Sequence, residues 1–170
     1  MRYAGIIKND IAAGKKVNLT FFTQGCPIHC QDCHNPEAWD FNGGKEFTND
    51  TLKEILQGLN ANGVQRNFSV MGGEPLCDEN LFLTDLVITN VREHYPDILI
   101  YIWTGYLAEN LFQSNKPHLK HILELSDYLI DGPYIVAERD ITLAMRGSKN
   151  QKIINIREYM QNEIIESGKN

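Results

Sequence analysis

An alternation of strand-like and helix-like segments runs along most of the chain and limits the folds open to it. The strand-like segments are short and rich in β-branched, aliphatic or aromatic residues. They span 17–22, 67–71, 98–103, 128–130 and 152–156. Segments with helical spacing of apolar residues lie between or after them, at 48–59, 78–95, 107–112, 118–125 and 157–166. Strands that alternate with helices predict parallel βαβ units, and therefore an α/β fold with a mostly parallel sheet.

Residues with unusual chemistry or turn-forming character follow four of the predicted strands. They are the cysteine segment 26–33, Gly72–Pro75, Thr104–Tyr106 and Asp131–Pro133. In parallel α/β folds, ligands bind at the carboxyl ends of the strands. We therefore expect these four loops to converge on one site.

The cysteine segment is the strongest chemical signal, because Cys26, Cys30 and Cys33 have the spacing C-x3-C-x2-C. A fully ligated iron–sulfur cube takes four thiolates, so three would leave one iron open to a further ligand. A structural zinc site takes four Cys or His ligands, and here His29 or His34 would supply the fourth. The spacing favours the iron–sulfur interpretation and leaves zinc open. Cys77 lies far from the cluster, and we expect a buried, inert thiol there.

Length and charge narrow the class of protein further. A chain of 170 residues is the size of one domain, so we expect a single compact domain over 1–170. A net charge of −6 argues against nucleic-acid and anionic-membrane partners. No apolar run approaches the length of a membrane span or a secretory signal, so we expect a cytoplasmic protein. Disorder is expected only for the last residues, Ser167–Asn170.

The cysteine spacing after the first predicted strand and Gly72-Gly73-Glu74-Pro75 after the next resemble the two motifs of the radical S-adenosylmethionine (SAM) superfamily. Within it, four further segments resemble the activating proteins of anaerobic (class III) ribonucleoside-triphosphate reductases. They are Cys33–Trp39, Thr104–Tyr106, Asp131–Pro133 and Arg146–Gln151. The sequence departs from many superfamily members at Asp32, where an aromatic residue commonly precedes the third cysteine.

The resemblance implies a partial, open α/β barrel and a [4Fe-4S] cluster bound by Cys26, Cys30 and Cys33. SAM would bind the open iron, with Asp32, Cys33, His34, Gly72, Gly73 and Glu74 as its contacts. One electron from the cluster would cleave SAM reductively to a 5′-deoxyadenosyl radical. That radical would generate a glycyl radical on the large reductase subunit. The electron donor would be a reduced flavodoxin- or ferredoxin-like protein.

Three alternative functions remain at the level of sequence. Two keep the radical chemistry: activation of another glycyl-radical enzyme, or a reaction on a small molecule such as a ring contraction. The third is a zinc-binding interaction module without catalysis. Outside the motifs, we expect His94, His118 and His121 to lie on the surface, because no cysteine or carboxylate pattern recruits them to a site. The family likeness implies that Arg146 contacts cofactor or partner.

Overall fold

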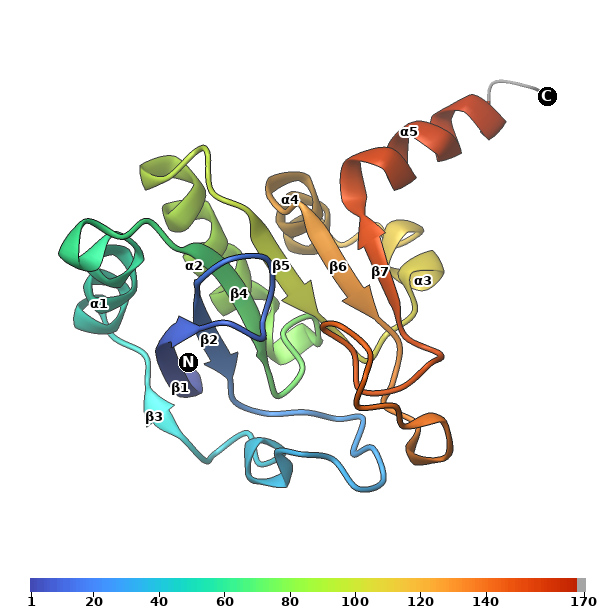
Figure 1. Cartoon of the computed structure of the whole chain (residues 1–170), viewed down its shortest axis with the longest axis horizontal. Coiled ribbons are helices and arrows are strands. Elements are labelled where there is room, and N and C mark those ends of the chain that lie inside the picture. Colours follow the sequence, from blue (N-terminus) through green and yellow to red (C-terminus); the bar gives the residue numbers. More distant parts are fainter. Residues whose placement is uncertain (168–170) are drawn as a thin grey trace.

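The computed structural model describes residues 1–167 and is built on one seven-stranded sheet (Figure 1). Ser167 is thus the only residue of the predicted disordered segment that is described. The strands are β1 (Arg2–Asp10), β2 (Asn18–Thr23), β3 (Lys45–Glu46), β4 (Asn67–Gly72), β5 (Ile100–Trp103), β6 (Tyr128–Asp131) and β7 (Lys152–Asn155). Their order across the sheet is β3-β1-β2-β4-β5-β6-β7. The four central strands, β2, β4, β5 and β6, are parallel to one another, whereas the pairs at both edges are antiparallel.

Helices connect the parallel strands, as the alternation predicts. They are α1 (Asn49–Leu59), α2 (Asp78–His94), α3 (Ala108–Phe112) and α4 (Pro117–Leu125), and a further helix, α5 (Ile156–Ser167), follows the last strand. Short 3-10 helices occur at Pro36–Ala38, Ala61–Gly63 and Val136–Glu138. The helix α5 projects away from the body of the molecule (Figure 1). Among the described residues, no helix is long and apolar enough to cross a membrane.

The hydrophobic core lies between the sheet and its helices. Side chains alternate between the two faces of a strand, and the strand register aligns the buried apolar residues into rows. One row joins Leu19, Phe68 and Ile100; the next joins Phe21, Val70, Ile102 and Leu129. All seven of these side chains are fully buried. The second row alone spans the four central strands, so the core holds these strands, and the loops that follow them, in a fixed order.

The other face of the sheet is covered in part by the connection between β1 and β2. Ser69 donates a hydrogen bond to the carbonyl oxygen of Ala13, and the backbone N–H of Lys15 donates to the hydroxyl of Tyr101 at 3.3 Å. Further along the strands, Phe22 and Met71, which are paired neighbours, instead line a cavity. This face of the sheet therefore leaves room for a ligand toward the carboxyl ends of the strands.

The helices and strands predicted between residues 17 and 156 are confirmed, and their ends differ from the predicted ends by no more than two residues. Thr48 caps α1 through a reciprocal pair of hydrogen bonds with Thr51, which explains why the helix begins at Asn49. Two strands escaped prediction: β1, and the two-residue β3 at the sheet edge. For the last helix the sequence also predicts a solvated acidic face that includes Glu163 and Glu166, but these two side chains lie outside those that the structure describes.

Two of the surface histidines have a carboxylate partner that the sequence did not indicate. His118 and His121 of α4 are half-exposed, as predicted, but each lies within hydrogen-bond distance of the Asp85 carboxylate of α2, at 2.6 and 2.7 Å. Sequence reasoning missed this contact because Asp85 lies more than 30 residues away. The three side chains tie α2 to α4 on the outside of the molecule.

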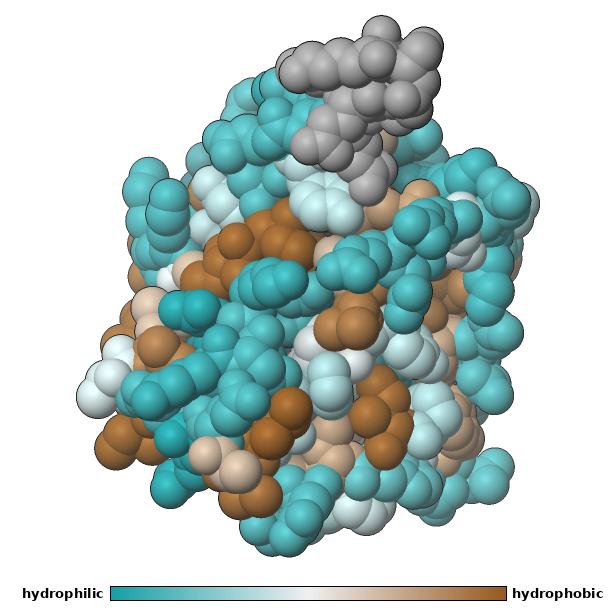
Figure 2. Space-filling model, turned by 90° about the vertical axis from the view of Figure 1, so that its right-hand side faces the viewer, coloured by the Kyte–Doolittle hydropathy of each residue, from teal (hydrophilic) through white to brown (hydrophobic). Residues whose placement is uncertain are grey.

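The surface beside β7 and α3 has no single continuous apolar face. Figure 2 shows apolar side chains there in several separate patches between hydrophilic ones. The exposed apolar residues of this region include Leu107, Ile135, Val136 and Ile141. This face therefore exposes scattered apolar groups rather than a broad hydrophobic surface.

Candidate functional site

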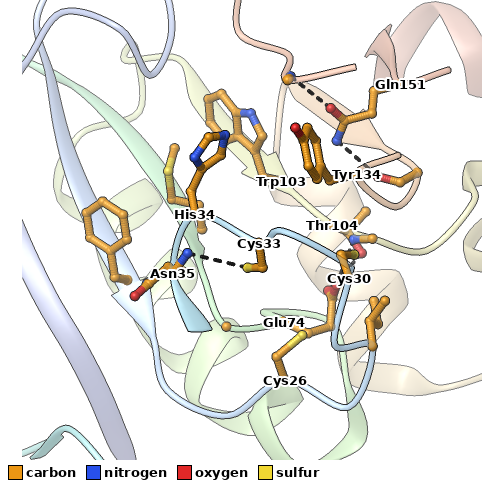
Figure 3. A pocket seen from close by; sticks show the side chains of 18 of the residues that line it. Cys26, Cys30, Cys33, His34, Asn35, Glu74, Trp103, Thr104, Tyr134 and Gln151 are labelled. Carbon is orange, nitrogen blue, oxygen red and sulfur yellow. Dashed lines mark hydrogen bonds between the residues drawn. The ribbon is translucent and has the colours of Figure 1, made fainter. Parts of the chain in front are cut away.

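A cavity of about 300 Å³ lies where the four predicted loops meet (Figure 3). Its walls include the three cysteines of the loop after β2, Gly72 to Glu74 after β4, Thr104 and Gly105 after β5, and Gly132 after β6. Figure 3 shows the cysteines and Glu74 around one end, with His34, Trp103 and Tyr134 at the other. The predicted convergence of four strand-end loops is confirmed.

Backbone hydrogen bonds hold the cysteine loop in place at both ends. Gly25 and Cys26 donate to the carbonyl oxygens of Ala38 and Trp39, at 2.8 and 3.1 Å, which closes the base of the loop. Inside it, His29 and Asp32 adopt the left-handed conformation, with φ of 51° and 55°, so the chain turns sharply beside Cys30 and Cys33. All three cysteines are reduced and partly exposed. The loop thus presents three thiols to one cavity.

The two glycines of the second motif let this loop pack against the end of β4. Gly72 has a φ of +111°, where a side chain would be strained, and a Cβ on Gly73 would lie only 2.2 Å from the carbonyl oxygen of Gly25. That same oxygen accepts a hydrogen bond from the N–H of Glu74 at 2.8 Å. Close approach of two backbone segments therefore requires these glycines, independently of any ligand.

Glu74 joins the second and third loops at the floor of the cavity. Its side chain is 1% exposed. One carboxylate oxygen accepts hydrogen bonds from the Leu76 N–H and the Thr104 hydroxyl, at 2.9 and 2.7 Å, and the other accepts from the Gly105 N–H at 2.7 Å. Burial raises the pKa of Glu74 to about 7, although the three donors act in the opposite direction. The group is a buried carboxyl that can gain or lose a proton near neutral pH.

The far wall comes from the connection between β6 and β7. Trp103 donates its indole N–H to the carbonyl oxygen of Met145 at 2.8 Å. Gln151 accepts from the backbone N–H of Gly147 at 2.9 Å and donates to the carbonyl oxygen of Gly132 at 3.0 Å. These contacts fold the connection back over the cavity.

Sequence reasoning missed several wall residues, namely Phe22, Met71, Tyr134 and Met145, all of which line the cavity. Tyr134 directly follows the Asp131–Pro133 turn, and that position was the only signal that could have identified it. Arg146 does not line the cavity; its guanidinium donates to the Gln151 carbonyl oxygen at 3.2 Å.

The remaining predicted site residues separate into two groups. His34 lines the cavity, and its ring centre lies 5.5 Å from that of Tyr134. Asp32 is exposed and is not among the lining residues. Cys77 is 2% exposed outside the cavity, and burial raises the pKa of its thiol to about 12, as expected for an inert cysteine.

The three thiols fit an iron–sulfur cluster better than a single ion. Within residues 1–167, no three Cys, His, Asp or Glu side chains are close enough together to bind one metal ion. A cube places each thiolate on a different iron, so the sulfurs need only surround a common volume, and the cavity supplies one. Burial raises the pKa of the Cys26 thiol, so cluster binding there would release a proton.

Fold and site together define a protein of the iron–sulfur class, with an α/β sheet that presents three cysteines from a strand-end loop. Residues 12–154 match the family described as a 4Fe-4S single cluster domain. This match favours the iron–sulfur interpretation over the zinc module that the spacing had left open.

Several relatives match nearly the whole chain. Each of them is named an anaerobic ribonucleoside-triphosphate reductase-activating protein. That of Pasteurella multocida is 32% identical over 94% of this chain and 100% of its own length. That of Escherichia coli is 30% identical over 92% of this chain and 100% of its own length, and that of Enterobacteria phage T4 is 30% identical over 90% and 93%. The chain belongs to the family of anaerobic ribonucleoside-triphosphate reductase-activating proteins.

Proposed function

We propose that this protein is a radical SAM activase that generates a glycyl radical on an anaerobic ribonucleoside-triphosphate reductase. The observation that carries the proposal is the family membership over nearly the full length of both chains, joined to three cysteines that line one cavity. When bound, the [4Fe-4S] cluster and SAM supply a one-electron cleavage that yields methionine and a 5′-deoxyadenosyl radical. The radical takes a hydrogen atom from a glycine of the reductase.

The residues of the cavity have distinct tasks in this proposal. Cys26, Cys30 and Cys33 would hold the cluster and leave one iron open to the amino and carboxylate groups of SAM. Carbonyl oxygens of the turn Gly72–Glu74 would accept hydrogen bonds from that amino group. The carboxyl of Glu74 already accepts three hydrogen bonds from the protein, so its task is to hold the second and third loops together.

The other walls orient the nucleoside part and exclude water. Trp103 and Tyr134 offer aromatic surfaces at the end of the cavity away from Glu74 (Figure 3). His34 lines the same region and is our candidate for a contact with the adenosine. A contact from Asp32 would require a movement of its loop, because its side chain lies outside the lining.

The wider setting follows from the same proposal. The chain acts as one domain over 1–170, in the cytoplasm, with a sheet curled into a partial barrel. The open side of the barrel would lie between the two edge strands of the sheet, β3 and β7, and would admit a loop of the large reductase subunit. A reduced flavodoxin- or ferredoxin-like protein would supply the electron.

The test begins with anaerobic reconstitution of the cluster, followed by reduction in the presence of SAM. We expect methionine and 5′-deoxyadenosine, and a glycine-centred radical by electron paramagnetic resonance once the reductase is added. The variant Cys30→Ala should lose iron and both products, whereas Cys77→Ala, outside the cavity, should keep them.

The negative outcomes separate the alternatives. An intact cluster that cleaves no SAM would exclude radical SAM chemistry. Cleavage of SAM without a radical on the reductase would point to another glycyl-radical enzyme or a small-molecule substrate. Zinc in place of iron and sulfide after anaerobic purification would indicate the non-catalytic module.

A further inference from the structure

Trp39 is held rigidly against the cysteine loop. Its carbonyl oxygen accepts the N–H of Cys26 at 3.1 Å. Its ring stacks on that of His29, with ring centres 4.6 Å apart and planes inclined by 25°. His29 lies between the first two cysteines, so backbone and ring contacts both fix the indole relative to the ligands of the cluster.

The indole nitrogen of Trp39 has no hydrogen-bond partner although it is buried. Among the described residues, two other buried side-chain atoms share this condition, Nε of Arg146 and Oδ1 of Asn150, and neither residue lines the cavity. Trp39 does line it. An unpaired buried donor lowers stability, so native proteins rarely leave one without an acceptor.

The second tryptophan of the chain lies at the same cavity, and its indole N–H does have a hydrogen-bond acceptor. Trp103 also lines it, and its N–H donates to the carbonyl oxygen of Met145 at 2.8 Å. The indole N–H can only donate. A ligand in the cavity can supply the acceptor that Trp39 lacks, and a cluster would bring sulfide and thiolate sulfurs to that place.

We propose that Nε1 of Trp39 donates a hydrogen bond to a sulfur of the iron–sulfur cluster and raises the reduction potential of that cluster. The inference rests on the cluster of the proposed function and is independent of SAM cleavage and of the reductase. Reduction adds one negative charge to the cluster, so a donor aimed at a sulfur stabilises the reduced form more than the oxidised form. The N–H of Asn35, which lies 3.4 Å from the Cys33 sulfur, is positioned to act in the same way.

The first test is the midpoint potential of the reconstituted cluster, measured by titration under anaerobic conditions. Trp39→Phe keeps one aromatic ring, removes the donor and makes the side chain smaller, and we expect a more negative potential at unchanged iron content. Trp103→Phe makes the same change at the same cavity to an N–H that is already bound to the Met145 carbonyl oxygen, so its potential should not become more negative. Water entering beside a smaller ring would raise the potential instead, so the sign of the shift separates the two effects.

The second test needs no change at Trp39. The Trp103→Phe protein is prepared with tryptophan that carries ¹⁵N in the indole ring, so that Trp39 holds the only labelled nitrogen. Pulsed electron paramagnetic resonance of the reduced cluster should then detect the magnetic coupling between the cluster and this nitrogen. Absence of the coupling, or a Trp39→Phe potential equal to that of the wild type, would overturn the inference. An intact cluster that fails to cleave SAM would contradict the proposed function, whereas the midpoint potential and the ¹⁵N coupling would still test the Trp39 hydrogen bond.

Discussion

Glu74 is the residue whose proton matters most to the site. Its carboxyl is almost completely buried, and its pKa is raised to about 7 from an ordinary 4.5 because burial disfavours the charge. Three donors from two loops converge on it nevertheless. Ionisation of the Glu74 carboxyl therefore affects the hydrogen bonds that hold the loops Gly72–Pro75 and Thr104–Tyr106 together.

The raised pKa predicts a pH dependence of stability for the cluster-free protein. Because the folded-state pKa lies above the unfolded one, the contribution of Glu74 is fully present below about pH 4.5 and is lost as pH rises through about 7. A shift of this size corresponds to about 3 kcal/mol. Urea unfolding of wild type and Glu74→Gln across this range should show the extra decline in wild type alone. Parallel declines in the two proteins would contradict the assignment.

Gly73 is a second residue whose effect can be predicted from one contact. A Cβ at this position would lie 2.2 Å from the backbone oxygen of Gly25, at the start of the cysteine loop. We expect Gly73→Ala to displace that loop and to lower the iron bound after reconstitution several-fold, while circular dichroism shows an intact sheet. Gly5→Ala is the control, since a Cβ there meets nothing within 4 Å. Wild-type iron content in Gly73→Ala would show that the loop can shift at no cost.

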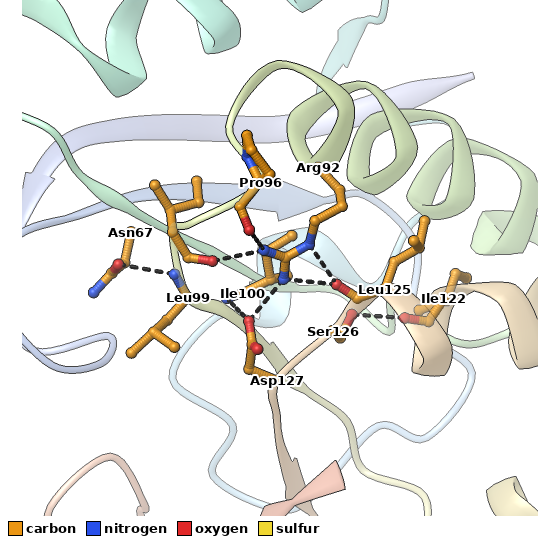
Figure 4. A network of polar contacts seen from close by, with 10 residues as sticks. Asn67, Arg92, Pro96, Leu99, Ile100, Ile122, Leu125, Ser126 and Asp127 are labelled. Carbon is orange, nitrogen blue, oxygen red and sulfur yellow. Dashed lines mark hydrogen bonds and ion pairs between the residues drawn. The ribbon is translucent and has the colours of Figure 1, made fainter. Parts of the chain in front are cut away.

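At the scale of elements, Arg92 connects α2 to the strands at the end of the sheet away from the cavity (Figure 4). Its guanidinium donates to the carbonyl oxygens of Pro96, Ile98 and Leu125 and to the carboxylate of Asp127, at 2.7 to 3.0 Å. Leu125 is the last residue of α4, so Arg92 also satisfies an end carbonyl of that helix. One side chain thus joins two helices to the starts of two strands.

This network predicts a large effect on stability and none on the cavity. Arg92→Ala leaves three carbonyl oxygens without their donor and the Asp127 carboxylate without its cation, although the Ile100 N–H still donates to that carboxylate. We expect the free energy of unfolding to fall by about 3 kcal/mol. Lys53→Ala should change it by less than about 1 kcal/mol, because its ion pair with Asp50 is exposed. Urea denaturation of both variants measures the difference. Equal changes in the free energy of unfolding of the two variants would mean that the Arg92 contacts contribute little to stability.

At the scale of the whole molecule, the two ends of the sheet have different tasks. The cavity lies where the parallel strands end, and the Arg92 network where they begin. The core rows between them are continuous across the four central strands. The loops can therefore change with ligand binding while the sheet and its helices stay as they are.

Hydrogen exchange can test this division. Loading of the cluster and SAM should slow amide exchange in all four loops together, from the cysteine segment to Gly132, and in the connection up to Gln151. Amides around Arg92 and Asp127 should exchange at the same rate with and without the cluster, because they lie at the end of the parallel strands opposite to the cavity. Protection confined to the cysteine loop would show that the other three loops do not share the site.

Much of the fold could be predicted because its signals are local. The apolar runs of β4 and β5, the cap at Thr48 and the turn after β4 each depend on a few neighbouring residues. The strand β1 escaped because it is partly exposed, and Ile7, Lys8 and Asn9 at its end are all exposed, so it shows neither an apolar run nor a clear alternation. The two residues of β3 are too few to form a pattern.

The sequence by itself determined the class of fold, the order of the elements and which loops would share a site. It could do so because strand periodicity, turn chemistry and cysteine spacing each depend on residues that are close together in the chain. Only the tertiary structure decided which side chains face the cavity. Tyr134 and Met145 reach it because Gln151 holds their loop to Gly132, and Trp39 is left with an unpaired donor there. Such contacts depend on the packing of distant segments, which no local pattern records.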